Sequence, residues 1–147
     1  MNPAKEYLLQ IRKIEDQIRR IEWNAADIRS RLGISAIRYD GDRVQTSAGD
    51  PMAEAFARLD EVEREEQRTL SDLRRKRTEI AQMLYPLPEK YSNLLYLRYC
   101  KLMRLDKVAD TMGYSYEYIR RMHGEALREF GERYPEQIAA YLEEVRR

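Results

Sequence analysis

Cysteine and histidine each occur only once in this chain of 147 residues, as Cys100 and His123. A single cysteine excludes a disulfide within the chain and is typical of proteins from a reducing compartment. A single histidine with no cysteine pattern around it lacks the ligand spacing of a zinc site, so we expect no bound metal. The sequence also contains no Gly-rich phosphate loop and no Ser-His-Asp set. We therefore predict that the protein needs no cofactor and is not an enzyme.

Long apolar runs and an excess of charge of one sign are missing as well. No run approaches the ~20 apolar residues that cross a bilayer, and the opening residues MNPAKEYLLQ do not form the apolar core of a signal peptide. We expect a soluble, cytoplasmic protein that does not bind membranes. The formal net charge is +1, so any nucleic-acid site must come from a local group of basic residues.

Helix-forming residues are abundant instead. Charged residues make up 36% of the chain and hydrophobic residues 43%, with many Ala, Leu, Glu and Arg. This composition is typical of long helices and predicts an all-α fold. A chain of this length holds one domain, or one small domain together with an extended helical element.

The clearest helical pattern covers residues 4–32. Its apolar residues recur at steps of four and three, which is the heptad spacing of a coiled coil. They are Tyr7, Ile11, Ile14, Ile18, Ile21, Ala25, Ile28 and Leu32. We predict a long helix that ends at Gly33. Residues 33–51 are rich in Gly, Ser and Asp and predict a loop, with Pro51 in the first turn of the next helix.

A second long helix is predicted for residues 52–85, although Glu63, Glu66 and Arg77 interrupt its apolar seam. Neither helix can bury its stripe alone, so we predict that residues 1–85 form a long antiparallel, coiled-coil-like hairpin. The poor second seam leaves part of the Ile-rich first seam for another copy. We therefore expect a homo-oligomer, from dimer to tetramer, formed through this hairpin.

Pro86 and Pro88 mark the start of a second module, residues 86–147, because the residue before a proline disfavours helical geometry. After a first helix at about 88–101, the next apolar run ends at Gly113, which suits a left-handed C-cap, and the following run starts after Ser115, which suits an N-cap. Two helices joined by such a tight turn predict a helix-turn-helix. A short C-terminal helix begins at Pro135.

The stretch from Leu94 to Phe130 resembles region 4 of bacterial sigma factors. The resemblance lies in a Leu-x-x-Leu-Arg-Tyr helix, a Val-Ala pair, a turn glycine, a Ser-x-Glu-x-Ile-Arg start and a closing Ala-Leu pair, here Leu94, Leu97, Arg98, Tyr99, Val108, Ala109, Gly113, Ser115, Glu117, Ile119, Arg120, Ala126 and Leu127. With its charged hairpin and Pro-containing joint, the whole chain is similar in layout to the ArpU and RinA late-gene activators of phages and prophages. The resemblance implies a phage-encoded, sequence-specific transcriptional regulator in the cytoplasm of a bacterial host cell. It would bind double-stranded DNA and act at promoters with RNA polymerase.

The chain departs from the sigma pattern at the turn before the second helix. Sigma-type modules usually have Gly at the position of Leu102 and a Ser or Thr N-cap at that of Arg104. We expect Asp106, in the first turn, to compensate in part through the helix dipole. Tyr116 and Tyr118 replace the commoner arginines, so the DNA sequence that is read should differ from the usual promoter element.

The resemblance places the contact residues position by position. Tyr116, Glu117, Arg120 and Arg121 match the recognition-helix positions that face the major groove, where Arg pairs with guanine and Glu accepts from cytosine. The expected phosphate contacts are Ser115, His123, Arg128, Lys101 and Lys107.

Two alternative functions remain open at this point. A phage DNA-packaging component of the small-terminase kind also combines a helix-turn-helix with a coiled-coil element. Alternatively, the sigma-like module binds RNA polymerase or a sigma factor and makes no DNA contact, which the net charge of +1 permits.

Overall fold

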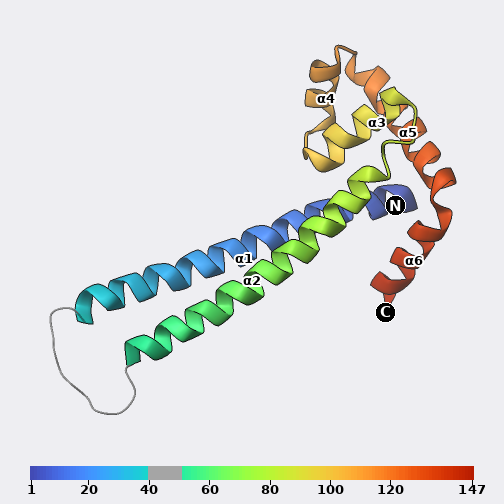
Figure 1. The fold of residues 1–147 in the computed structure, drawn as a ribbon. Helices are drawn as coiled ribbons and strands as arrows, with labels where there is room; N and C mark the ends of the chain where they lie inside the picture. The colour runs from blue at the N-terminus through green and yellow to red at the C-terminus, as the bar shows by residue number, and fades with distance from the viewer. Residues whose placement is uncertain (40–50) are drawn as a thin grey trace. The chain divides into compact units, whose positions relative to one another are not determined.

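The computed structural model describes residues 1–39 and 51–147, with only the backbone described for residues 32–39. Every regular element in these ranges is helical, which confirms the predicted all-α class (Figure 1). The elements are α1 (Pro3–Tyr39), α2 (Pro51–Gln82), α3 (Glu89–Leu95), the π-helix η1 (Tyr96–Cys100), α4 (Leu105–Met112), α5 (Tyr116–Arg133) and α6 (Pro135–Arg146). No helix in the described ranges is long and apolar enough to span a membrane.

Gly33 does not end the first helix, contrary to the prediction, because α1 continues to Tyr39. A glycine inside a helix costs about 1 kcal/mol relative to alanine, but it keeps the backbone N–H that helix hydrogen bonding needs. One glycine is therefore too weak a signal to stop a long helix. The rest of the predicted loop, at 40–50, lies outside the described residues. Pro51 begins α2 as predicted.

Two compact units make up the described chain, one of residues 1–15 with 75–147 and one of residues 16–74. They do not coincide with the predicted division after residue 85, because the first turns of α1 pack on α5 and α6. The Tyr7 ring lies 5.9 Å from that of Phe130 and 5.5 Å from that of Tyr141. In addition, the Tyr7 hydroxyl lies 3.4 Å from Met83 Sδ, and the Tyr134 hydroxyl donates to the Met83 carbonyl at 2.7 Å.

In the unit of residues 16–74, ion pairs join α1 to α2 in antiparallel order. Arg29 contacts Glu63 at 2.8 Å and Glu66 at 3.1 Å, while Arg74 contacts Glu22 at 3.3 Å. The acidic residues that interrupt the second seam thus bind a cation of the facing helix. The Glu66 carboxylate is buried, which is tolerated because Arg29 supplies its counter-charge.

The larger unit contains the second module and its core. Residues 101–104 lead from η1 into α4, and a short turn at residues 113–115 leads from α4 into α5. The core consists mainly of the apolar residues that the three predicted runs supply, together with residues of α1 and α6: Leu8, Ile11, Leu94, Leu95, Tyr99, Val108, Ala109, Ile119, Met122, Ala126, Leu127, Phe130 and Ile138. This core fixes the exposed face of α5.

Candidate nucleic-acid interface

The turn between α4 and α5 has a cap on each side. Gly113 adopts the left-handed conformation at φ 76° and ψ 30°, and its N–H donates to the Ala109 carbonyl at 2.9 Å. The Ser115 side chain then accepts a hydrogen bond from the Tyr118 N–H at 3.2 Å. Both caps were predicted from the sequence and are confirmed. Together they fix where α4 stops and where α5 starts.

The turn before α4 has a leucine at a position with positive φ and an arginine at the N-cap, and both residue types are uncommon there. Leu102 adopts a positive φ of 57°, which costs a side chain with a Cβ about 1–2 kcal/mol. Arg98 Nη1 donates to the Met103 carbonyl at 2.9 Å, which helps to hold this turn. Arg104 makes no side-chain cap, but Asp106 Oδ1 accepts from the Lys107 N–H at 2.9 Å. The compensation by Asp106 therefore includes a hydrogen bond as well as the helix dipole.

The first two turns of α5 carry the four residues predicted to face DNA bases, and the side chains of Tyr116, Glu117, Arg120 and Arg121 are all exposed. The Arg120 guanidinium lies 5.8 Å from the centre of the Tyr116 ring. Within the described residues, no carboxylate lies within ion-pair distance of Arg120 or Arg121. Both guanidinium groups are therefore available to an outside acceptor.

The predicted phosphate contacts do not all share one surface. Ser115, Lys107 and Arg128 are exposed on the turn, on α4 and on α5. Lys101 is also exposed, but it lies beside Tyr96, 5.9 Å from the ring centre. It lines a cavity of about 420 Å³ with Arg77 and Glu15, whereas Arg121 and Arg128 line a different cavity.

His123 lies toward the core. Its Nε2 is 2.8 Å from the Tyr99 hydroxyl, and the two rings stack with centres 5.8 Å apart. Burial, with the nearby charges of Lys5 and Arg98, lowers the pKa of His123 to about 4. The imidazole is therefore neutral at neutral pH and lacks the charge of a phosphate contact. His123 is therefore not among the proposed phosphate contacts.

Residues of α3 flank the start of α5, and sequence reasoning did not assign them to the site. Lys90 Nζ lies 5.9 Å from the centre of the Tyr114 ring, which itself lies 4.9 Å from that of Tyr118. The Tyr91 hydroxyl donates to Glu125 at 3.1 Å. The only signal in the sequence was the Lys-Tyr pair in the first turn of a short helix, which is too common to single out.

Metal ligands and the cysteine are the other candidates for a reactive site among the described residues. Within the parts of the chain that the structure describes, no three His, Cys, Asp or Glu residues gather in a way that would hold a metal ion. Burial raises the pKa of the Cys100 thiol to about 11, so it is not a thiolate at neutral pH. Comparison of the chain with protein-family models, curated proteins and solved structures returned no match.

Proposed function

We propose that this protein is a sequence-specific DNA-binding transcriptional regulator, phage-encoded, in which α4, the turn and α5 act as a helix-turn-helix. The observation that carries the proposal is the start of α5. Arg120 and Arg121 are exposed there without an acidic partner, directly after a turn whose caps at Gly113 and Ser115 fix the direction of the helix. A recognition helix needs both properties, since its first residues must reach base edges in a defined orientation.

The chemistry of the exposed residues suits base reading. An Arg guanidinium donates two parallel hydrogen bonds to the O6 and N7 of guanine, and the Glu117 carboxylate can accept from the amino group of cytosine. Arg120 lies over the Tyr116 ring. This contact already restricts the Arg120 side chain, so the side chain loses less conformational entropy on binding. Tyr116 in turn offers an apolar edge to a thymine methyl group.

Phosphate contacts would position this helix. Lys107 on α4 and Arg128 on α5 are exposed cations, and the positive end of the α5 helix dipole favours an anion. Because the net charge is only +1, these local contacts must supply most of the electrostatic attraction.

The α1–α2 pair is proposed to form the hairpin that joins copies or contacts RNA polymerase at a promoter. Ile21, Ile28, Leu59 and Val62 are only half-buried in the unit of residues 16–74. A second copy would cover such a stripe. Glu63 and Glu66 bind Arg29 of the same chain, which favours a small oligomer over the large ring of a packaging protein.

The proposal is tested by footprinting the chain on the DNA that flanks its own gene. We expect one protected segment with two half-sites about 34–36 Å apart, or a multiple of that, because an oligomer presents two recognition helices. Protection that does not exceed that of random DNA at the same salt concentration would contradict DNA reading and favour the polymerase-binding alternative.

A further inference from the structure

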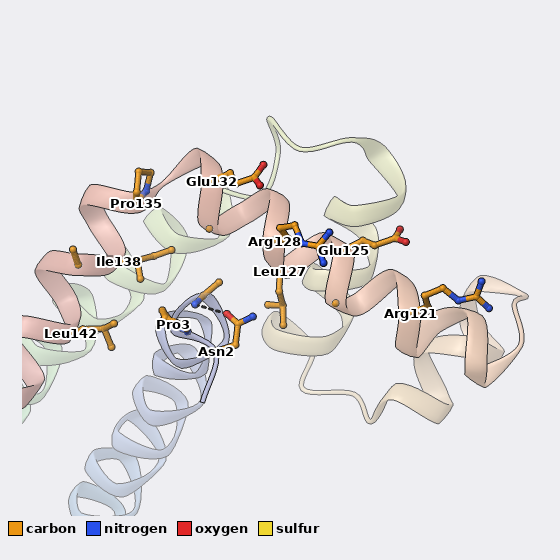
Figure 2. Close-up of a pocket in the computed structure, with 14 residues that line it drawn as sticks. Asn2, Pro3, Arg121, Glu125, Leu127, Arg128, Glu132, Pro135, Ile138 and Leu142 are labelled. Atoms are coloured by element: carbon orange, nitrogen blue, oxygen red, sulfur yellow. Dashed lines mark hydrogen bonds between the residues drawn. The ribbon is translucent and has the colours of Figure 1, made fainter.

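A groove runs along the second half of α5, between this helix, α6 and the first residues of α1 (Figure 2). Its volume is about 870 Å³, and its lining includes small or apolar residues such as Ala4, Gly124, Leu127 and Gly131. A Cβ atom added at Gly124 would meet nothing within 4 Å. The backbone of α5 is therefore open to close approach by another helix at this point.

A row of four charges lies along the same stretch of α5, formed by Arg121, Glu125, Arg128 and Glu132, as Figure 2 shows. We call these residues the charge row. They are spaced by four, three and four residues, they are all exposed, and their signs alternate. Among the described residues, no ion pair involves any of them; Glu125 instead accepts a hydrogen bond from the Tyr91 hydroxyl at 3.1 Å.

Within the described helix α5, neighbouring charges of the row form no ion pair, although Glu125 and Arg128, three residues apart, are in the favourable order. In the pairs Arg121 with Glu125 and Arg128 with Glu132, the basic residue comes first, which is the less favourable order for a pair four residues apart. The row does not suit DNA either, since two of its four members are carboxylates that phosphate would repel. A protein surface with alternating charge suits it better.

The charge row of one copy is complementary to the charge row of a second copy that runs in the opposite direction. If two α5 helices lie antiparallel, Arg121 of one copy meets Glu132 of the other, and Glu125 meets Arg128. All four charges of each copy then face an opposite charge, and in the same register Gly124 lies two residues along the helix from the level of Gly131 of the second copy. Such a contact has the two-fold symmetry of most protein dimers.

We propose that α5 docks antiparallel on α5 of a second copy of this chain, with the groove receiving the second helix. The inference does not rest on DNA binding, because Tyr116, Glu117 and Arg120 lie outside the charge row. Arg121 and Arg128 belong to both surfaces, so docking between copies competes with base reading for Arg121 and with phosphate contact for Arg128.

A charge exchange tests the contact on the full chain, with mass measured by light scattering at low salt. Arg128→Glu places like charges opposite each other at two symmetric points, and we expect the mass to fall to half that of the unaltered chain. The double variant Glu125→Arg/Arg128→Glu exchanges both signs, and we expect it to restore the mass. Tyr91→Phe is the control, since it removes the bond to Glu125 without changing a charge, and it should leave the mass unchanged. An unaltered chain that is monomeric, an Arg128→Glu chain of undiminished mass, or a double variant that stays at the lower mass would each overturn the proposal.

Disulfide formation provides a second measurement that does not depend on charge. In a Cys100→Ser background, chains with Gly124→Cys are mixed with chains that carry Gly131→Cys and are oxidised gently. Antiparallel docking predicts a covalent dimer in the mixture and little in either variant alone, since residue 124 of one copy lies two residues along the helix from the level of residue 131 of the other. A mixture without a covalent dimer, or equal cross-linking by one variant alone, would exclude this register.

Discussion

At the scale of single residues, Tyr99 and His123 show how burial decides what a polar side chain does. Burial raises the pKa of Tyr99 to about 12 and lowers that of His123 to about 4, while a contact of 2.8 Å joins the two groups. Residue 123 falls at the border between the core face and the exposed face of α5. Helical spacing cannot assign such a position, because the residue that decides it comes from another helix.

The lowered pKa of His123 predicts a dependence of stability on pH. An unfolded chain binds a proton at His123 near pH 6.5, whereas the folded chain does so only near pH 4. The contribution of the neutral ring is therefore complete above pH 6.5 and is lost as the pH falls toward 4. We expect His123→Gln, which does not titrate, to lose less unfolding free energy than the unaltered chain over this range. Urea titrations of both chains at several pH values measure the difference, and equal slopes would show that the pKa is not lowered.

At the scale of elements, the sequence predicted best those features that a few neighbouring residues decide. Gly113 and Ser115 act on backbone groups within four residues of themselves, so both caps of the α4–α5 turn were predictable. The π-helix was not, because its hydrogen bond from the Lys101 N–H to the Tyr96 carbonyl differs from an α-helical bond by one residue and leaves no apolar pattern. The prediction that Gly33 ends α1 was wrong, because the low helix propensity of one glycine is too small to end a long helix.

Two glycines of the module should respond to alanine in opposite directions. Gly113 has a φ of 76°, so Gly113→Ala is expected to cost about 1–2 kcal/mol of unfolding free energy. Gly124 lies inside α5 with open space around its Cβ position, so Gly124→Ala is expected to gain about 0.5–1 kcal/mol. Urea unfolding at low protein concentration, where docking between copies does not contribute, compares the two variants. A loss of stability in both would mean that Gly124 also needs a backbone without Cβ.

At the scale of the whole molecule, the spacing of apolar residues in the sequence predicted which helix faces are apolar. It did not predict which other elements pack on those faces. Tyr7 was predicted in the seam of the hairpin because it fits the heptads of residues 4–32. In the structure it packs on Phe130 and Tyr141, far away in the sequence. A heptad pattern states that one face is apolar, and it cannot state which element of the chain packs on that face.

The central claim, that α5 reads DNA sequence, is tested most directly by comparing Arg120→Ala with Lys107→Ala on the footprinted site and on random DNA. Arg120→Ala should lose roughly 1–3 kcal/mol on the specific site and relax the preference at one base pair. Lys107→Ala should weaken binding to all sequences alike and lower the slope of affinity against salt by about one unit. If both variants lose equal affinity on specific and random DNA, Arg120 reads no base and the claim is wrong.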